Sequence, residues 1–397
     1  MLFKNFKIQS LTLIMVAFVL GFSEFIIVGI LNDLAKQFSV SVANVGLLVT
    51  MFALIYALST PFITLYIGRF NLFKVMLSLL AIFVFGNLLT ALASNYFILI
   101  LSRIITALVS GVIISVALTF ATFIAPLAKR AWLVSWIFSG FSIASVFGVP
   151  LGTWISTHFG WRQAFYLITM LSALTWLLFM LALPRNVKQA KVGSLKAQLV
   201  LLTDKRIWLG MLLPLFNLGG VYAFYTYLRP SLSQSLHFPT SWLTALLFVY
   251  GLMSLFSNQF SGVLAQNSGL NKMPLVFLAQ VVLLGFLPFF FMNQWLGLGV
   301  IMLIGLSMYL LNSPLQLHFL QVAEQDYPQA LVLASSLNSI FANFGIALGS
   351  ATGSLIVENF GLKPLGPSGA LYSILALVVV ISLNQVNQKR LASKKNC

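Results

Sequence analysis

The chain has 397 residues, of which 60% are hydrophobic and only 7% are charged, whereas a soluble domain carries about 25% charged residues. A soluble protein of this composition would lack a polar surface, so the composition excludes a water-soluble globular protein and indicates a membrane protein. The net charge of +16 would suggest nucleic-acid binding in a soluble protein, but basic residues at cytoplasmic membrane edges explain it here, and we expect no nucleic-acid partner.

The apolar segments are continuous and about 20 residues long, as transmembrane helices require, and they lack the alternating polarity of barrel strands. The first segment is longer than the apolar core of a signal peptide, so we interpret it as the first span. In chain order, we expect twelve transmembrane helices at residues 11–31, 43–66, 75–93, 97–120, 132–156, 163–183, 207–228, 242–264, 274–292, 297–319, 330–357 and 368–386.

The longest polar interruption lies almost at the middle of the chain, at residues 184–206. It predicts an N-terminal six-helix bundle (1–183), a cytoplasmic linker (184–206), and a C-terminal six-helix bundle with a short basic tail (207–397). The fold class is therefore an all-α membrane protein of twelve transmembrane helices in two bundles.

An internal repeat supports this division. Four residues of the fifth span and its end recur in the eleventh span after a shift of 201 residues, which is half the chain. The pairs are Gly148 and Gly349, Gly152 and Gly353, Phe159 and Phe360, and Gly160 and Gly361. Such a repeat predicts two pseudo-symmetric bundles with a substrate site between them at mid-membrane.

Lysine and arginine residues are unevenly distributed between the predicted loops. If the N-terminus lies in the cytoplasm, 17 of the 22 basic residues fall inside, 4 outside and 1, Arg103, within a span. The positive-inside rule therefore places both termini in the cytoplasm. Residues 321–329 are the exception, because this predicted inner loop carries Glu324 and Asp326 and no base. The chain has no Asn-x-Ser/Thr acceptor, which favours a bacterial inner membrane.

Glu24, in the segment GFSEFIIVGIL of the first span, is the most informative single residue. An ionisable side chain inside a span is costly and indicates function by default, and burial favours the neutral form of a carboxylic acid. A carboxyl group that binds a proton in one state and releases it in another can couple transport to a proton gradient. The alternative is a structural hydrogen bond to a neighbouring helix.

Arg103 lies in the fourth span, where the helical rise places it at a depth similar to that of Glu24. The two side chains could therefore pair across the bundle. Pairing would oppose protonation of Glu24, whereas burial favours it, and the sequence leaves both possibilities open. The alternative is that Arg103 extends to the outer interface.

Small residues recur every four positions in the fifth span, where Gly148 and Gly152 flank Pro150. Pro150 removes one backbone donor and weakens the helix, so this stripe is either a tight packing surface or a bending element of transport. Gly349 and Gly353 form its counterpart in the eleventh span.

Amide and phenol side chains lie within the spans of the second half and suit a cavity for a neutral or amphipathic ligand. Each taken alone is more readily explained as an interhelical hydrogen bond. Those predicted to line the substrate cavity are Asn217, Tyr222, Tyr225, Asn312, Gln316, Asn338 and Asn343. The 201-residue shift relates Tyr225 to Glu24, so the proton candidate is confined to the first half.

The sequence carries no nucleotide-binding loop and no metal-ligand spacing, since His158, His237 and His318 are far apart. One intramembrane acid without a clustered base or nucleophile argues against a membrane enzyme. We therefore expect no metal and no cofactor, with the proton gradient as the energy source. The expected partners are a small-molecule substrate, protons and the lipid bilayer, and we expect a monomer.

These motifs resemble the twelve-helix drug–proton antiporter branch of the major facilitator superfamily, and among its bacterial members the exporters of purine nucleosides, sugars or chloramphenicol. The resemblance covers nearly the whole chain and rests on GFSEFIIVGIL, Arg103, GVPLGTWISTHFGWR, FNLGGVYAFYTYLRPSL and NSIFANFGIALGSATGSLI. It implies the major facilitator fold, transport by alternating access and a proton-coupling role for Glu24. GVPLGTWISTHFGWR is similar to the family's antiporter motif, which carries Gly148, Pro150 and Gly152.

Two loops depart from the superfamily pattern. The loop YIGRFNLFKVML keeps Gly68, Arg69 and Lys74, which the resemblance assigns to gating, but it lacks the acidic residue of the superfamily's gating loop. In the equivalent loop of the second half, Gln266 stands where an aspartate is common. These departures weaken the case for a charge-based lock of the inward gate.

We therefore predict a secondary transporter that exports a small organic compound, such as a drug, nucleoside or sugar, in exchange for protons. An uptake symporter or facilitator on the same fold is the first alternative, because the helices do not encode direction. A membrane-embedded enzyme or receptor is the second, and it would give product formation or partner binding without net flux.

Overall fold

The computed structural model describes residues 5–67, 70–187, 199–266, 269–327 and 330–395. Within these ranges the chain consists of helices joined by short connections, with no strand. The helices of the first half are α1 (Phe6–Phe38), α2 (Val42–Ile67), α3 (Leu72–Ala91), α4 (Tyr96–Ile124), α5 (Leu127–Phe159) and α6 (Trp161–Ala182). Those of the second half are η2 (Val200–Thr203), α8 (Lys205–Tyr225), α9 (Leu228–Pro230), η3 (Ser231–Ser235), α10 (Thr240–Gln266), α11 (Gly269–Gly285), α12 (Leu287–Phe290), α13 (Gln294–Ser307), α14 (Asn312–Asp326), α15 (Leu331–Phe360) and α16 (Leu365–Lys395).

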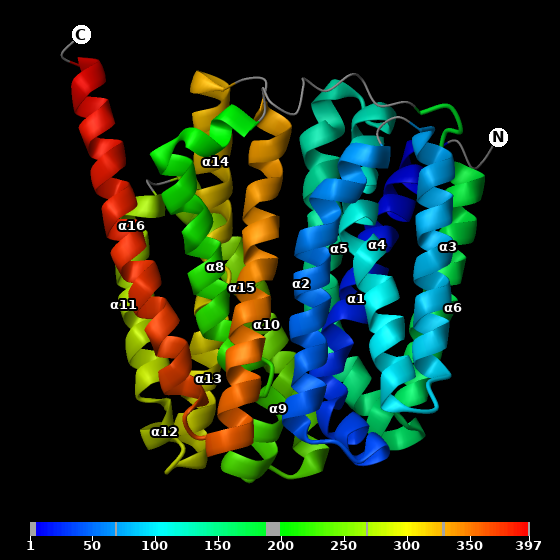
Figure 1. Ribbon diagram of the computed structural model, residues 1–397, viewed down its shortest axis with the longest axis vertical. Helices are drawn as coiled ribbons and strands as arrows, with labels where there is room; N and C mark the ends of the chain where they lie inside the picture. Colours follow the sequence, from blue (N-terminus) through cyan, green and yellow to red (C-terminus); the bar gives the residue numbers. More distant parts are fainter. Residues whose placement is uncertain (1–4, 68–69, 188–198, 267–268, 328–329, 396–397) are drawn as a thin grey trace. The chain divides into compact units, whose positions relative to one another are not determined.

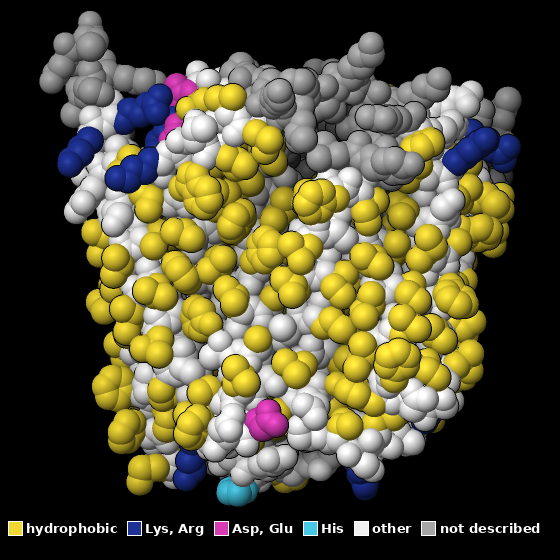
Figure 2. Space-filling view, in the orientation of Figure 1, with side chains coloured by type: hydrophobic (Ala, Val, Ile, Leu, Met, Phe, Trp, Pro, Cys, Tyr) yellow, Lys and Arg dark blue, Asp and Glu magenta, His cyan; other side chains and the backbone are white. Residues whose placement is uncertain are grey.

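Each predicted span lies largely within helix, and the predicted all-α membrane fold is confirmed. In the described ranges, 11 helical segments are long and apolar enough to cross a membrane, and α11 is a further apolar helix of 17 residues. On the face shown in Figure 2, hydrophobic side chains cover the middle, and Lys and Arg side chains lie near the two ends. Helices that face lipid show this distribution.

Short polar side chains fix where several helices begin. Asn5, Asn71 and Asn95 accept hydrogen bonds from backbone N–H groups in the first turns of α1, α3 and α4, and Asp204 does the same for α8. These caps satisfy donors that a helix start leaves unpaired. Gly160 separates α5 from α6 with a φ of 89°, a conformation that glycine adopts without steric cost.

The predicted tenth span is interrupted, because a four-residue turn separates α13 from α14. Pro314 has no backbone N–H, and its ring clashes with the carbonyl four residues earlier in a continuous helix. Two serines of α10 accept backbone N–H groups beside this break: Ser257 Oγ from Tyr309 at 2.8 Å and Ser261 Oγ from Ser313 at 2.7 Å. Side-chain acceptors of this kind let a broken helix persist at membrane depth.

The chain divides into two compact units of helices. Unit 1 comprises Met1–Lys191 and Ser241–Gly251, and unit 2 comprises Val192–Thr240 and Leu252–Cys397. In each unit the long helices run side by side (Figure 1). In unit 1, α1 is packed along α5, and in unit 2, α8 is packed along α15 and α16. The first helix of each half is therefore enclosed by its own unit.

The predicted linker is only partly described. Residues 188–198 lie outside the described ranges, and residues 205–206 already belong to α8. Before this gap the chain is anchored to the start of α3, because the Val187 carbonyl accepts a hydrogen bond from Leu72 N at 3.0 Å. Val187 is also buried in the apolar core of unit 1.

Candidate functional site

Glu24 lies on α1, two residues from the midpoint of this 33-residue helix. Its neighbours Ser23 and Phe25 are buried, whereas Glu24 is partly buried. Within the described ranges Glu24 makes no hydrogen bond and no ion pair. The structural alternative, a fixed hydrogen bond to a neighbouring helix, is therefore not observed, and the carboxyl group is available to change its protonation state.

Arg103 points into unit 1 rather than toward the outer interface, since its side chain is 1% exposed. Its Nη1 donates a hydrogen bond to Ser23 Oγ at 3.1 Å. The guanidinium carbon lies 4.6 Å from the centre of the Phe52 ring and 5.9 Å from that of Phe165. Aromatic faces at these distances stabilise a cation.

The question of whether Glu24 and Arg103 pair has a definite answer in this structure. The two groups lie within electrostatic range of each other, yet no ion pair joins them in the described part of the chain. Arg103 instead contacts the residue beside Glu24. The helical rise predicts a similar depth for the two residues, and in the structure they lie at the same site.

Ser23 and Asn87 were not predicted to take part. The Ser23 hydroxyl donates to Asn87 Oδ1 at 2.6 Å, and Asn87 Nδ2 donates to the Phe83 carbonyl at 2.9 Å. Both side chains are fully buried. Together with Arg103 they link α1, α3 and α4. Neutral polar residues are common in packed helices, so nothing in the sequence distinguished these two.

Unit 2 contains a cluster on its corresponding helices, but one without charge. Gln280 of α11 donates to Asn217 Oδ1 of α8 at 3.1 Å and to Ser307 Oγ of α13 at 3.2 Å. Asn217 Nδ2 in turn donates to the Met308 carbonyl at 3.0 Å. Asn217, predicted to line the substrate cavity, is thus held in contacts between helices of its own unit.

The glycine stripe of α5 is a packing surface against α1. A Cβ atom on Gly148 would lie 3.1 Å from Cδ2 of Phe22 and 3.6 Å from Cβ of Phe25. One on Gly152 would overlap the side chain of Ile26. The helix is continuous through Pro150, so the described structure shows close packing rather than a break at this position.

The contacts of this stripe repeat in unit 2 with the same shift of 201 residues. Gly349 lies against Ala223, as Gly148 lies against Phe22, and Gly353 lies against Tyr227, as Gly152 lies against Ile26. A Cβ added to Gly349 would overlap the Gly219 carbonyl and lie 3.0 Å from Ala223 N. One added to Gly353 would lie 2.5 Å from the Ala223 carbonyl oxygen and 3.0 Å from Cε2 of Tyr227. The repeat seen in the sequence therefore extends to the helix pairs that it relates, α1 with α5 and α8 with α15.

The remaining predicted cavity residues are partly or fully buried, and Asn312 also makes a hydrogen bond between helices. Asn312 Nδ2 donates to Asn258 Oδ1 at 3.4 Å, and Gln316 is partly buried. Tyr222 and Tyr225 are buried, with ring centres 5.0 Å apart in an edge-to-face arrangement.

Two α15 amides retain an unused acceptor. Asn343 Nδ2 donates to the Ser339 carbonyl at 3.0 Å, which leaves Asn343 Oδ1 buried without a partner among the described residues. Asn338 Oδ1 is likewise buried without a hydrogen-bond partner among the described residues. Buried acceptors without a partner are costly, so these two atoms are the strongest substrate-binding candidates of the predicted set.

The predicted gating residues are only partly visible. Gly68 and Arg69 lie outside the described residues. Lys74 is exposed in the first turn of α3, and its backbone N–H is capped by Asn71 Oδ1 at 3.4 Å. Asn71 also donates to the Arg185 carbonyl at 2.9 Å, which ties this end of α3 to the segment after α6.

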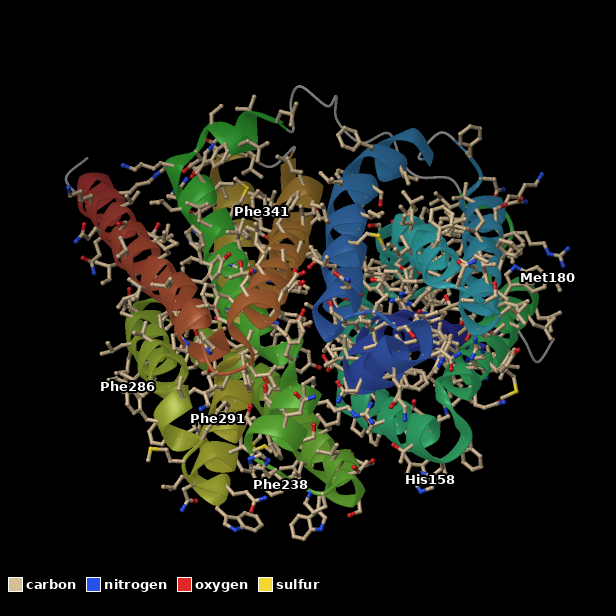
Figure 3. The ribbon with its side chains drawn as sticks, turned by 60° about the horizontal axis from the view of Figure 1, so that its bottom comes forward. His158, Met180, Phe238, Phe286, Phe291 and Phe341 are labelled. Atoms are coloured by element: carbon tan, nitrogen blue, oxygen red, sulfur yellow. The ribbon has the colours of Figure 1, made fainter. Side chains whose placement is uncertain are left out.

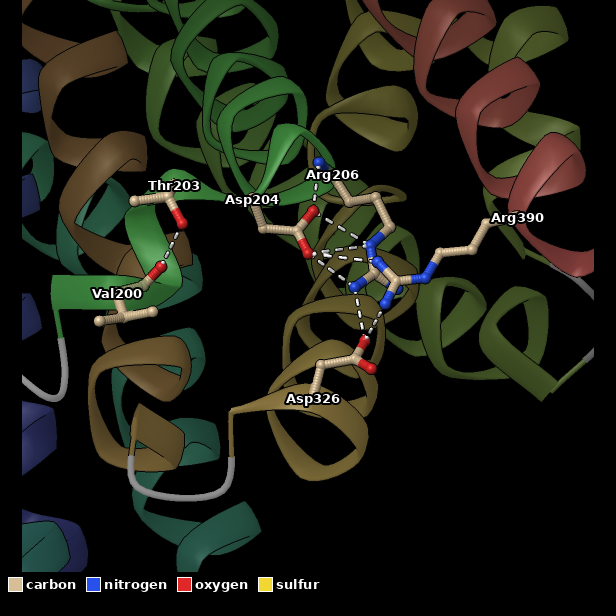
Figure 4. A network of polar contacts seen from close by, with 6 residues as sticks. All are labelled: Val200, Thr203, Asp204, Arg206, Asp326 and Arg390. Atoms are coloured by element: carbon tan, nitrogen blue, oxygen red, sulfur yellow. Dashed lines mark hydrogen bonds and ion pairs between the residues drawn. The ribbon is translucent and has the colours of Figure 1, made fainter. Parts of the chain in front are cut away.

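A four-charge cluster in unit 2, formed by Asp204, Arg206, Asp326 and Arg390, was not predicted (Figure 4). Arg206 Nη2 lies 2.7 Å from Asp204 Oδ2 and 2.6 Å from Asp326 Oδ2. Arg390 contacts the same two carboxylates at 3.5 Å and 2.9 Å. The cluster joins the start of α8, the end of α14 and α16. Asp326 lies in the predicted loop 321–329, which has no lysine or arginine, and the arginines that it contacts come from α8 and α16.

The charges of this cluster act on Asp204. Burial alone would raise its pKa, but hydrogen bonds and charge from Arg206, with the charge of Arg390, outweigh burial and hold the pKa below its usual range. His318, on the neighbouring α14, is buried, and its Nε2 has no hydrogen-bond partner within the described ranges. His158 is exposed near the end of α5, with Nδ1 2.9 Å from the Trp154 carbonyl (Figure 3).

A family model described as Major Facilitator Superfamily matches residues 13–330. The chain belongs to the major facilitator superfamily. It is therefore a multi-pass membrane transporter with a small-molecule substrate, and the members of this superfamily are transporters, not enzymes.

Relatives in this superfamily match almost the whole chain. The chain is 31% identical over 380 residues to the "Uncharacterized MFS-type transporter YtbD" of Bacillus subtilis (strain 168), with 96% of each chain covered. It is 29% identical over 366 residues to the "Inner membrane transport protein YdhP" of Escherichia coli (strain K12), with 92% of each covered. It is 31% identical over 364 residues to a "Probable sugar efflux transporter" of Helicobacter pylori (strain J99 / ATCC 700824), with 91% of each covered.

Solved structures of the superfamily share the fold. A bacterial homolog of the human lysosomal transporter Spinster, in an inward-facing and unoccupied conformation, has a TM-score of 0.74 at 15% identity, covering 97% of this chain and 98% of that chain. The nucleoside transporter NupG has a TM-score of 0.73 at 13% identity, covering 96% and 98%. Identities this low show the fold alone.

Proposed function

We propose that this major facilitator protein exports a small organic compound in exchange for protons, by alternating access across a bacterial inner membrane. The proposal includes cytoplasmic termini, the proton gradient as energy source, no bound cofactor and action as a monomer. The observation that carries it is Glu24, a carboxyl group near the middle of α1 without a hydrogen bond or ion pair in the described structure.

Glu24 suits the role of proton carrier for two reasons. Its position within a span lets it exchange protons with either side as the transporter alternates between conformations. The buried cation of Arg103 nearby stabilises the ionised carboxylate, whereas the apolar surroundings stabilise the neutral acid. The balance between these two effects can change with conformation, and such a change couples protonation to transport.

The substrate proposal rests on α15 and on the relatives. Asn338 and Asn343 each present a buried carbonyl oxygen without a partner among the described residues, which a ligand with O–H or N–H donors would satisfy. One relative is named as a sugar efflux transporter. We therefore place the substrate among neutral or amphipathic compounds that carry several hydrogen-bond donors, such as sugars, nucleosides and some drugs.

The test of proton coupling first identifies a transported compound and then measures its transport by the Glu24→Gln variant. Growth and export screens with deletion and overexpression across drugs, nucleosides and sugars identify a transported compound. Uptake of that compound into inverted vesicles is then measured with and without an imposed pH difference. Glu24→Gln keeps the shape and hydrogen bonding of the side chain but cannot release a proton, so we expect it to bind substrate and lose gradient-driven accumulation.

Glu358→Gln is the matched control, because Glu358 is an exposed carboxyl group on α15 and its loss should leave accumulation unchanged. If Glu24→Gln concentrates substrate as well as the parent does, the proton carrier lies elsewhere, and His318 becomes the next candidate. An uptake symporter, the main alternative, would lower the cellular content of the compound on deletion, whereas loss of an exporter raises it.

A further inference from the structure

Arg103 is held by neutral groups although a carboxyl group is close. The bond from Nη1 to Ser23 Oγ is the only hydrogen bond of its guanidinium among the described residues, and Nε is buried without a partner. A buried cation ordinarily pairs with an anion, because leaving its charge and donors uncompensated is costly. The observed position of Arg103 therefore suits a state in which Glu24 is neutral.

A second position for the guanidinium is within reach. Arg103 bonds Ser23, the residue next to Glu24 on α1, and its charge already acts on the Glu24 carboxyl group. A rotation of the long Arg103 side chain would exchange the Ser23 contact for the Glu24 contact. The Ser23 hydroxyl accepts from Arg103 because its own proton is committed to Asn87 Oδ1 at 2.6 Å. Asn87 thus orients the hydroxyl as an acceptor for the cation.

Glu24 and Arg103 are the titratable pair of this site. The elements that contact Arg103 contribute neutral side chains: Phe52 from α2, Asn87 through Ser23 from α3, and Phe165 from α6. On α5, Gly148 faces Phe22 and Phe25 beside Glu24, and the neutral Thr153 bonds the Gly29 carbonyl of α1. The other described charged residues of α1–α6 are Lys7, Asp33, Lys36, Lys74, Lys129, Arg162 and His158. The charge that acts on Glu24 is that of Arg103, and the charge that acts on Arg103 is that of Glu24.

We infer that Ser23 and Asn87 are positioning residues that hold the Arg103 guanidinium away from Glu24 while Glu24 carries its proton. They thereby set the pH at which Glu24 releases it, and this inference rests on the proposed function. When Glu24 ionises, the guanidinium leaves Ser23 and pairs with the carboxylate. In unit 2, neutral side chains alone join the corresponding helices, through Asn217 of α8, Gln280 of α11 and Ser307 of α13.

The test measures protonation of Glu24 without any substrate. Dicyclohexylcarbodiimide adds to protonated carboxyl groups in apolar surroundings, and peptide mass spectrometry locates the product, so labelling across a pH series in lipid nanodiscs reports the protonated fraction of Glu24. Asn87→Leu and Ser23→Ala release Arg103 toward Glu24. We expect the labelling midpoint to fall by about one pH unit, which is about a tenfold loss of proton affinity.

A second substitution at the same position should act in the opposite direction. Asn87→Asp attracts the guanidinium to the Ser23 side, so the midpoint should rise. General damage to packing would not give opposite shifts from two substitutions of one residue. Thr90→Val is the matched control, because Thr90 also bonds α3 to α4, through Ser102 Oγ at 2.8 Å, and its loss should leave the midpoint unchanged.

The outcomes separate this inference from the proposed function. Midpoints that stay at the parent value in Asn87→Leu, Asn87→Asp and Ser23→Ala overturn the positioning role, even if Glu24→Gln abolishes gradient-driven accumulation. A shift in Thr90→Val equal to that in Asn87→Leu also overturns it. If Glu24 in the parent shows no pH-dependent labelling, the proton carrier itself is wrong, and both proposals fall.

Discussion

The four-charge cluster of unit 2 allows a comparison of two arginines that contact the same carboxylates. The Arg206 side chain is 8% exposed, whereas that of Arg390 is 38% exposed. Removing Arg206 leaves Asp204, whose side chain is 6% exposed, with the 3.5 Å contact to Arg390 as its remaining ion pair in the described structure. Removing Arg390 leaves both short contacts of Arg206 in place.

The expected magnitudes follow from this difference in burial. Removing one partner of a buried ion pair costs about 3–5 kcal/mol, because the other charge is left uncompensated. Arg390 compensates part of that loss, so we expect Arg206→Met to destabilise the protein by about 2–3 kcal/mol. An exposed ion pair contributes about 0–1 kcal/mol, and Arg390→Met should fall in that range.

The assay is thermal unfolding of the purified protein in detergent, followed by tryptophan fluorescence, with parent and both variants measured side by side. The Tm of Arg206→Met should fall clearly below that of Arg390→Met. Equal losses from the two variants, or a larger loss from Arg390→Met, would refute the argument from burial. A near-parent Tm for Arg206→Met would show that the cluster does not stabilise this end of unit 2.

The same cluster gives a pH dependence with a definite sign. The pKa of Asp204 is lowered in the folded protein, because contacts with Arg206 and Arg390 outweigh the effect of burial. A lowered pKa contributes stability that is present above the unfolded value of about 3.9 and is lost as the pH falls through the folded pKa. The Tm of the parent should therefore drop more steeply in acid than that of Asp204→Asn.

Two further predictions concern packing and orientation. In Gly148→Leu, the first added carbon would lie 3.1 Å from Cδ2 of Phe22. We expect this variant to insert into the membrane, to lose about 1–3 kcal/mol of stability and to stop transport, and normal flux would contradict the packing argument. Gly262→Leu is the control, because a Cβ added to Gly262 meets nothing within 4 Å. Cys397 is the only cysteine of the chain and lies outside the described residues. If both termini are cytoplasmic, a membrane-impermeant thiol reagent should label Cys397 in inverted vesicles and not in intact cells. Strong labelling of intact cells would show that the predicted orientation is wrong.

Hydropathy and charge by themselves determined the membrane fold, because lipid imposes a length and an apolar composition on every span. The same constraint made Glu24 and Arg103 conspicuous, since ionisable residues are rare inside spans. The 201-residue repeat was visible because glycine is required where two helices come close, and the structure shows that close approach at Gly152 and Gly353.

Only the tertiary structure decided which polar groups meet. Ser23 lies 64 residues from Asn87 and 80 residues from Arg103 in the chain, and Asp204 lies 186 residues from Arg390. A hydrogen bond or ion pair between two helices depends on how each is rotated and how deeply it is set, and hydropathy fixes neither. The sequence predicted that Glu24 and Arg103 lie at similar depth. Only packing among α1, α3 and α4 decided that Arg103 binds Ser23 and not Glu24.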